Sequence, residues 1–373
     1  MAALLLSSAA AAGKGNLVWA RWQPVAGVFD VAGPLPDQTL LVATAHGLFR
    51  LSPEGTLSPL SSQYIPEAGA EAYIALSSGL AVAGAGCSFP AGTAFLLKPG
   101  ASPAVLALDL ATGSISTLAT IAGIDTLSGI AFDRHGRFGN RLLVIGPRSG
   151  ATVVDAIDCR GGVATVTNSA PRMEGGMEVA PPSFGAYGGD LVVPDEVSGD
   201  IIAITPEGTT QVVARTGPPT GPDVGAESAG FVPPGFLGGG WAYLADRATP
   251  GPGHPGTDSM LRLSAIELRD QGVAEGDLLI AGEGGGATIA VHCGPDGSCS
   301  DARRIGSASG PAHVEGHLLL VADRPGVAAR PLPEGRLGAA GRGGVFLLLP
   351  YAVGIVVLAG LYLLYRRRSP RPR

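Results

Sequence analysis

Four glutamates stand directly before, or at the start of, short apolar runs: Glu71, Glu174, Glu178 and Glu227. Carboxylate oxygens are the ligands that Ca²⁺ prefers, and a site needs several of them around one point. If the runs that carry these glutamates meet at a common axis, the sequence predicts a divalent-metal site there, with calcium as the first choice. The alternative is that they are solvated side chains of surface loops, which is where glutamate usually lies.

A second group of candidate ligands is His313, Glu315 and His317, which are spaced by two residues. On a strand this spacing puts all three side chains on one face, and two imidazoles with a carboxylate suit Zn²⁺. Gly310 and Gly316 favour an ordinary polar loop instead. Both interpretations stay open, so His313 and His317 join the candidate metal ligands.

Three aspartates, Asp195, Asp246 and Asp323, each follow an apolar run of the same kind. A single active site needs a given group once, whereas a repeated turn needs its capping residue in every copy. The recurrence therefore favours a turn-capping role, which aspartate performs by accepting bonds from nearby backbone N–H groups.

The four cysteines, Cys87, Cys159, Cys293 and Cys299, form an even set without a Cys-x-x-Cys pair. Neither a redox motif nor a zinc motif is therefore indicated. Cys293 and Cys299 enclose Gly-Pro-Asp-Gly-Ser, a turn composition that would bring their Cα atoms within the ~4.4 to 6.8 Å of a disulfide. We predict a disulfide in this hairpin, and the pairing of Cys87 and Cys159 stays open.

The charge balance separates the tail from the rest of the chain. The sequence has 25 basic and 31 acidic residues, and five of the basic ones are arginines in the last eight positions, which leaves 20 against 31. A body this acidic repels phosphate backbones, so we expect no nucleic-acid binding. Phosphate loops, dinucleotide fingerprints and the Gly-x-Ser-x-Gly elbow are also missing from the sequence.

Residues 345–365 read VFLLLPYAVGIVVLAGLYLLY, from Val345 to Tyr365, without a charged side chain. As a helix this segment would span about 31 Å, enough to cross a bilayer. We predict a single transmembrane helix. Because the arginine-rich residues 366–373 follow at once, the positive-inside rule puts the C-terminal tail in the cytoplasm and the N-terminal body outside the cell membrane.

The N-terminal residues 1–16 contain an Ala/Leu-rich run that resembles a signal peptide, although Lys14 follows the run instead of preceding it. A disordered Ala-rich end is the alternative. The predicted organisation is a signal peptide at 1–16, an extracytoplasmic domain at 17–335, a linker at 336–344, the transmembrane helix, and a cytoplasmic basic tail. An even cysteine count agrees with an oxidising compartment.

The body repeats one theme, in which short apolar runs alternate with Gly, Pro and Asp turns. Many short strands look like this. The segment from Met177 aligns with the segment from Gly230, so that Pro-Pro falls on Pro-Pro and Phe184 on Phe236, and a third copy begins at Gly129. A period of about 50 residues with several strands per unit is typical of β-propeller blades. We predict an all-β propeller with six blades, and seven as the alternative.

The repeated elements are a Gly-hydrophobic-acidic start, a Phe-Gly or Gly-Gly turn, a run such as Leu-Val-Val-Pro-Asp-Glu, and Gly-x-Ile-x-x-Ile. Over residues 120–335 this pattern resembles the six-bladed propellers of the NHL-repeat and gluconolactonase-like superfamily. The resemblance implies a propeller and, in gluconolactonase-like members, a divalent metal, often calcium, held in the channel by Glu, Asn and Asp. This chain has only three asparagines, Asn16, Asn140 and Asn168, so that ligand set is not carried over intact.

The combined expectations define a membrane-anchored, extracytoplasmic β-propeller that acts as a binding or scaffold module for a protein or a small-molecule ligand. The alternative is a membrane-tethered, metal-dependent lactonase or esterase that uses channel acids such as Glu178. Catalytic residues are not identified. The proline-rich insertions at 217–228 and 247–259 are the predicted contact loops, since long loops on one rim of a propeller commonly carry binding.

Overall fold

The structure is a computed structural model that describes residues 16–67, 70–249, 253–300 and 302–323. The chain divides into two compact units, Met1–Arg324 and Pro325–Arg373, and every described residue belongs to the first. The predicted linker, transmembrane helix and tail, and the predicted signal peptide up to residue 15, lie outside the described residues. Within those residues, no helix has both the length and the apolar character to cross a membrane.

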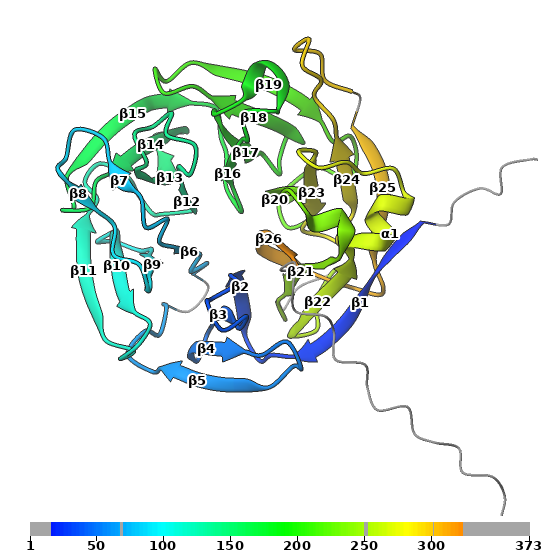
Figure 1. Cartoon of the computed structure of the whole chain (residues 1–373), viewed down its shortest axis with the longest axis horizontal. Helices are drawn as coiled ribbons and strands as arrows, with labels where there is room; N and C mark the ends of the chain where they lie inside the picture. Colours follow the sequence, from blue (N-terminus) through cyan, green and yellow to red (C-terminus); the bar gives the residue numbers. More distant parts are fainter. Residues whose placement is uncertain (1–15, 68–69, 250–252, 301, 324–373) are drawn as a thin grey trace, which may run out of the picture. The chain divides into compact units, whose positions relative to one another are not determined.

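The described residues form an all-β propeller of six four-stranded blades around a central axis (Figure 1). Four blades are separate sheets. The other two share an eight-stranded sheet, because β25 (Arg303–Ala308) and β1 (Leu17–Pro24) pair in parallel at its middle. The prediction of six blades is confirmed, and the alternative of seven is wrong.

The first four blades follow the chain in order, each from an inner strand at the axis to an outer strand. Blade 1 consists of β2 (Val28–Ala32), β3 (Leu40–Thr44), β4 (Gly47–Leu51) and β5 (Leu57–Ser61). Blade 2 consists of β6 (Ile74–Leu76), β9 (Thr93–Lys98), β10 (Ala104–Asp109) and β11 (Ile115–Thr120). Blade 3 consists of β12 (Gly129–Phe132), β13 (Leu142–Arg148), β14 (Ala151–Ile157) and β15 (Val163–Ala170). Blade 4 consists of β16 (Glu178–Val179), β17 (Leu191–Pro194), β18 (Asp200–Ile204) and β19 (Thr210–Arg215).

The last two blades exchange strands along the chain. Blade 5 consists of β20 (Ala226–Phe231), β23 (Leu278–Gly282), β24 (Thr288–Val291) and β25. Blade 6 consists of β26 (Val314–Ala322), β21 (Gly240–Asp246), β22 (Ser259–Ser264) and β1. After β20 the chain leaves blade 5, forms the two middle strands of blade 6, and returns to blade 5 through helix α1 (Ala265–Asp270).

This exchange corrects the interpretation of the Pro-Pro repeat. Both copies contain a short 3-10 helix, η1 (Gly185–Tyr187) or η2 (Phe236–Gly238), with Phe184 or Phe236 fully buried. In the first copy the flanking strands β16 and β17 pair with each other, whereas in the second copy β20 and β21 lie in neighbouring blades. The periodicity therefore identifies a recurring local segment, but not the strands with which that segment pairs.

Neighbouring blades pack face to face, which explains why the inner and second strands are apolar at nearly every position. All residues of β2, β3, β17 and β23 are buried, whereas most residues of the outer strand β15 are exposed or half-buried. Between blades 2 and 3, the rings of Phe89, Phe95 and Phe132 meet edge to face. Such packing buries apolar surface that no single blade could cover.

The ring is closed by blade 6, which combines the N-terminal strand β1 with the C-terminal strand β26. Beside this closure the guanidinium of Arg262 lies between two rings, 4.4 Å from the centroid of Trp241 and 5.2 Å from that of Trp22. Cation–π contacts of this kind add to the pairing of β1 with β22. The inner strands are thereby held at a fixed spacing around the channel.

The described residues contain two disulfides. Cys293 and Cys299 are bonded as predicted, with Cα atoms 3.9 Å apart, because the two residues face each other across a β-bridge. The second disulfide joins Cys87 to Cys159 and closes a separation of 72 residues. It ties the hairpin of β7 (Ala81–Val82) and β8 (Cys87–Ser88) to the turn after β14.

Candidate metal centre in the propeller channel

The two ends of the channel are built from different parts of each blade. The first residues of the longer inner strands, or the residues that lead into the shorter ones, meet at one end of the channel, and the inner strands finish at the other end. β16 is so short that its first residue, Glu178, already lies at the second end. The second strand of each blade is antiparallel to the first and returns to the end where the inner strands begin. We call this end the acidic mouth, because six glutamates gather there: Glu71, Glu174, Glu196, Glu227, Glu283 and Glu315.

The centre of the acidic mouth is a trio of carboxylates around one phenol. The Tyr73 hydroxyl lies 3.0 Å from Glu71 Oε2, 2.7 Å from Glu227 Oε1 and 3.3 Å from Glu315 Oε2. A tyrosine carries one O–H proton and can donate it to only one acceptor at a time. Oxygens of the three carboxylates also lie within 4.8 Å of one another. The trio therefore needs protons or a cation beyond what Tyr73 supplies.

A second trio shares Glu315 with the first. His313 Nε2 lies 3.0 Å from Glu283 Oε1 and 3.2 Å from Glu315 Oε1. Its backbone N–H donates to Asp246 Oδ1 at 2.9 Å, which fixes the start of β26 against the end of β21. Glu283 Oε2 is buried and receives no hydrogen bond within the described part of the chain.

One arginine contacts two of the central carboxylates, those of Glu315 and Glu71. Arg247 Nη1 lies 3.2 Å from Glu315 Oε1 and 3.7 Å from Glu71 Oε1. Arg247 follows directly on β21, and its own guanidinium is stacked 4.6 Å from the ring centroid of Phe29. With Glu227 and Glu283, four carboxylates thus face two cationic groups, Arg247 and His313. When all are ionised, two negative charges remain.

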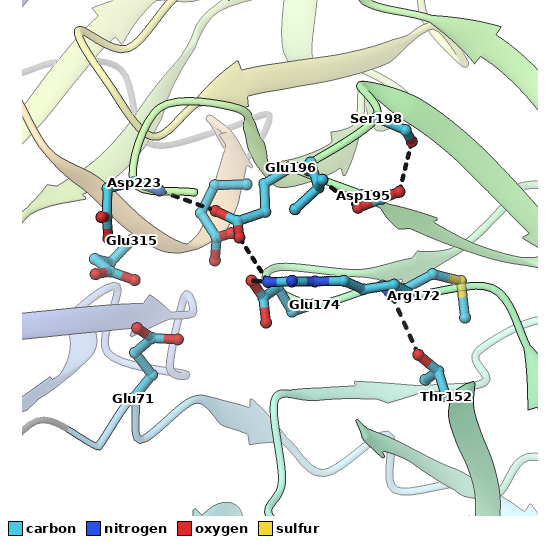
Figure 2. A network of polar contacts seen from close by, with 12 residues as sticks. Glu71, Thr152, Arg172, Glu174, Asp195, Glu196, Ser198, Asp223 and Glu315 are labelled. Atoms are coloured by element: carbon cyan, nitrogen blue, oxygen red, sulfur yellow. Dashed lines mark hydrogen bonds and ion pairs between the residues drawn. The ribbon is translucent and has the colours of Figure 1, made fainter. Parts of the chain in front are cut away.

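The remaining two glutamates form an outer layer (Figure 2). Arg172 Nη2 lies 3.1 Å from Glu174 Oε1 and 2.9 Å from Glu196 Oε1, and the backbone N–H of Asp223 donates to Glu196 Oε2 at 3.2 Å. Figure 2 also shows Glu71 and Glu315 facing each other across the mouth. Each proline-rich insertion has a residue at the acidic mouth: Asp223 of 217–228 bonds to Glu196 in the outer layer, and Arg247, the first residue of 247–259, contacts Glu315 and Glu71 in the centre.

Burial and mutual repulsion raise the pKa of several of these carboxyls. Burial and the nearby Glu315 carboxylate raise the pKa of Glu71 to about 8. Burial and the Glu174 carboxyl raise the pKa of Glu196 to about 9, and burial with Glu315 raises the pKa of Glu227 well above its usual value. A bound cation would reverse these shifts, since opposite charge favours the ionised carboxylate.

His313 behaves in the opposite way. Burial alone would lower its pKa, but the carboxylates of Glu283 and Glu315 outweigh that effect and raise the pKa to about 10. His313 is therefore an imidazolium near neutral pH and acts as a counter-charge. A cation placed among Glu71, Glu227 and Glu315 would use oxygen ligands alone, which is the donor set that Ca²⁺ prefers.

Gly175 has no side chain, and the Glu227 carboxylate lies in the space that a side chain at this position would fill. Its φ of +93° is a conformation that favours glycine, and a Cβ at this position would lie 2.6 Å from Glu227 Oε1. Its backbone N–H is bonded to Ser128 O at 2.9 Å, which fixes the turn before β16. The same Cβ would lie 2.2 Å from the backbone oxygen of Glu227, so a side chain here would force both the backbone and the carboxylate of Glu227 to shift.

Below the acidic mouth, two side chains cross the axis. Tyr73 reaches from blade 2 to Glu227 of blade 5. His317, from blade 6, contacts Asp30 Oδ2 through Nδ1 at 2.9 Å and the Ile130 carbonyl of blade 3 through Nε2 at 2.8 Å. The rings of Tyr73 and His317 meet edge to face with centroids 6.3 Å apart. Together they separate the acidic mouth from the other end of the channel, where the inner strands finish.

The predicted ligands are thus divided between the two ends. Glu227 and His313 belong to the two central trios, together with Glu71 and Glu315, and Glu174 lies in the outer layer. Glu178 and His317 do not join them, because they lie beyond the Tyr73 ring and line a cavity at the opposite end. The spacing of two does not put His313 and His317 on one face, since Gly316 has a φ of +70° and interrupts the alternation of β26.

The sequence analysis did not identify Glu196 or Glu283 as candidate ligands. Their positions just after second strands could have indicated them. Asp195 and Asp246 stand at the end of second strands, and Asp195 caps its turn by accepting from the Val197 N–H at 3.0 Å. Glu283 occupies the equivalent place after β23 of blade 5. Asp323 is different, because it follows the inner strand β26, so matching it to Asp246 is wrong.

The fold and the site together define the class: a six-bladed β-propeller whose channel is acidic at one end. No family model matches this chain, and no curated protein matches its sequence. The resemblance to six-bladed propellers is confirmed as a resemblance in fold.

Three solved structures illustrate it. A virginiamycin B lyase from Staphylococcus aureus is 13% identical, with a TM-score of 0.40 over 75% of this chain and 84% of the lyase. A candidate gluconolactonase is 14% identical, with a TM-score of 0.34 over 66% of this chain and 91% of its own. A chain of a nidogen–laminin complex is 13% identical, with a TM-score of 0.35 over 74% and 96%. At these identities the likeness concerns the fold alone.

Proposed function

We propose that this chain is a membrane-anchored, extracytoplasmic β-propeller that binds a divalent cation, with calcium as the first choice, at its acidic mouth and acts as a binding module. The cation would be held by Glu71, Glu227 and Glu315, with Glu283 beside them. Residues 217–228 and 247–249 contact this mouth through Asp223 and Arg247 and would carry contacts to a partner.

The observation that carries the proposal is the shortage of hydrogen-bond donors among buried carboxylates. Glu283 is 6% exposed, and its Oε2 receives no hydrogen bond from any described residue. The Glu196 carboxyl lies beside Glu283 and can donate a hydrogen bond to it only while it keeps its own proton. The Tyr73 hydroxyl has one proton to donate, and three carboxylates lie around it, those of Glu71, Glu227 and Glu315. When all four carboxylates are ionised, the two excess negative charges match one divalent cation, whose binding would displace the protons that the raised pKa values of Glu71 and Glu227 hold in the metal-free site.

The outward location is supported by the chain's sulfur chemistry. All four cysteines are paired in disulfides, and disulfides persist mainly in oxidising compartments. The apolar segment 345–365 and the arginines after it supply the anchor and its orientation in this proposal. A reporter fused to the C-terminal tail is expected to be inside the cell, and a reporter found outside would contradict this topology.

A metal-dependent hydrolase is the second candidate, since a metal beside a histidine can activate water. The observation against this candidate function concerns the general base that must take a proton from the water. In the metal-free chain the carboxylates of Glu283 and Glu315 raise the pKa of His313 to about 10, and both lie against its Nε2, so this nitrogen is engaged by two acids and does not face a substrate water. We therefore place the binding module first.

The proposal is tested by titrating calcium chloride calorimetrically into the full-length chain, freed of metal with a chelator. We expect one site per chain with a Kd between roughly 100 µM and 1 mM, the range of extracellular calcium sites. Glu227→Gln should weaken binding at least about tenfold, because it removes one charged ligand from a buried site. Glu54→Gln, which changes an exposed glutamate far from the channel, is the matched control.

Two results would contradict the calcium site. One is the absence of any calcium heat in the wild-type chain under these conditions. The other is equal calcium affinity in the wild type and Glu227→Gln, which would show that the cation lies elsewhere.

A further inference from the structure

The second end of the channel holds a cavity of about 380 Å³, around which all six inner strands finish. Ile74, Phe132, Phe231 and Leu320 are among the side chains that line it. His317 lies at its inner end, toward Tyr73. We call this end the apolar mouth. Its volume falls in the range of pockets that enclose small organic molecules.

Four titratable side chains line this cavity in the described structure: Arg134, His135, Glu178 and His317. His317 has no free donor, since its ring nitrogens contact Asp30 and the Ile130 carbonyl. Burial opposes its charged form, but Asp30 outweighs that effect and raises the pKa of His317. Burial lowers the pKa of His135, which disfavours its charged form. Arg134 is then the cation that can hold an anionic ligand, with Glu178 beside it.

Arg134 carries unused hydrogen-bonding capacity. Its Nη2 donates to the Leu76 carbonyl at 3.0 Å, and a guanidinium has five N–H donors. No carboxylate of the described residues lies within 4.0 Å of it to form an ion pair. Arginine is the side chain best suited to hold a carboxylate, because its planar donors match the two carboxylate oxygens.

Glu178 is placed to support an anion on Arg134. Its Oε2 accepts from the Phe231 N–H at 2.8 Å, which leaves Oε1 for a ligand. Burial raises the pKa of Glu178, although Arg134 and His317 act in the opposite direction. In its neutral form Glu178 donates a proton to a ligand oxygen. An ammonium ligand would instead face the positive charges of Arg134 and His317.

We propose that the apolar mouth binds a small organic anion, a carboxylate with a compact apolar body whose head group lies on Arg134 and Glu178. The apolar body would replace water along the aliphatic and aromatic wall. This site is independent of the acidic mouth, because Tyr73 and His317 separate the two, and it does not rest on the metal proposal.

The test uses three soluble probes with one common body: 3-phenylpropanoate, 3-phenylpropanol and 3-phenylpropylamine. Each is titrated calorimetrically into the full-length chain in a nonionic detergent, with a blank titration into detergent alone. We expect the carboxylate to bind at least about tenfold more tightly than the alcohol, the effect of one charge-assisted contact. We expect no measurable binding of the amine.

Matched variants locate the head group. Arg134→Gln should weaken 3-phenylpropanoate at least about tenfold. Arg160→Gln is the control, since Arg160 is also exposed and its Nη2 also donates to a backbone carbonyl, that of Gly86 at 3.3 Å. Glu178→Gln keeps an N–H donor toward the ligand, so binding should be retained. The wild type should bind 3-phenylpropanoate more tightly as the pH falls and Glu178 gains a proton, and Glu178→Gln should lose this pH dependence.

Each other outcome overturns the anion site. Equal binding of the alcohol would show an apolar cavity without head-group recognition. Tighter binding of the amine would show an ionised Glu178 acting as a cation site. Absence of binding by all three probes, or equal affinity in Arg134→Gln and wild type, would show that the cavity is not a site for this class of ligand.

Discussion

The two mouths of the channel are formed by the same six inner strands but have opposite chemistry. At the acidic mouth, the strand starts and second-strand ends contribute six glutamates with too few donors. At the apolar mouth, the strand ends contribute hydrocarbon side chains and an arginine without an ion-pair partner. The first mouth has fewer cationic groups than carboxylates, and the second offers positive charge.

This difference shows how little sequence a propeller needs to make a site. At each end of the channel, a few residues of the inner strands and of the segments beside them decide what that mouth can bind. Tyr73 and His317 then keep the two environments apart, because both side chains reach across the axis to an opposite blade. Predictions can be made for the partition and for each mouth.

The largest effect is expected when the partition is broken with His317→Ala. Asp30 is fully buried and forms an ion pair with His317 at 2.9 Å. Removing one partner of such a pair costs about 3 to 5 kcal/mol of unfolding free energy, because a buried charge is left without its counter-charge. Denaturant unfolding of the full-length chain measures it, with exposed His46→Ala as the control. A loss below about 1 kcal/mol would show that the pair does not hold the partition.

An intermediate effect is expected for Tyr73→Phe, and it should depend on calcium. The change removes the one proton shared by Glu71, Glu227 and Glu315, and hydrogen bonds to charged groups contribute about 1.5 to 3 kcal/mol. The loss should appear in the metal-free chain and shrink when calcium is bound, since the cation then satisfies the carboxylates.

Tyr64→Phe is the matched control for this change. Tyr64 is also buried, but its hydroxyl donates to the neutral carbonyl of Leu97 in blade 2. Its removal should cost about 1 kcal/mol whether or not calcium is present. If Tyr73→Phe behaves in the same way, the carboxylate trio does not bind the cation.

The smallest effect is expected from pH on the metal-free chain. The pKa of Glu71 is raised to about 8, that of Glu196 to about 9 and that of His313 to about 10. A group whose pKa is raised by folding stabilises the fold below its unfolded pKa and loses that contribution as pH rises through the folded pKa. Thermal stability should therefore fall from about pH 5 to pH 10. Solvent screening reduces the contribution of Glu71, whose side chain is 35% exposed, more than those of the buried Glu196 and His313.

Calcium provides the control for the pH series. A bound cation keeps the carboxylates ionised, so the calcium-loaded chain should lose less stability between pH 5 and pH 9 than the metal-free chain. A metal-free chain whose thermal stability rises with pH over this range would contradict the direction of the shifts.

Sequence reasoning reached the fold through local patterns. Alternating runs and turns predicted strands, their period predicted six blades, and the turn between Cys293 and Cys299 predicted a disulfide; all three are confirmed. It could not show the exchange of strands between blades 5 and 6, because strand pairing is a long-range property. The pairing of β20 with β23, for example, bypasses the adjacent strand β21.

The site was predicted only in part, because its contacts, like the pairing of strands, join residues that are distant in the sequence. Glu227 and His313 stand beside apolar runs and could be identified as candidates, but the groups that surround them come from distant positions. Tyr73, for example, contacts Glu227 across 154 residues and Glu315 across 242. The separation of His317 from His313 depends on the single positive φ of Gly316, which a spacing of two does not reveal.

A crossed titration tests the central claim, that the channel holds two independent sites of opposite charge preference. Calcium and 3-phenylpropanoate are each titrated into the full-length wild type, Glu227→Gln and Arg134→Gln. The account predicts that Glu227→Gln loses calcium and keeps the carboxylate, whereas Arg134→Gln loses the carboxylate and keeps calcium. A variant that loses both ligands together, or two variants that bind both ligands as the wild type does, would contradict it.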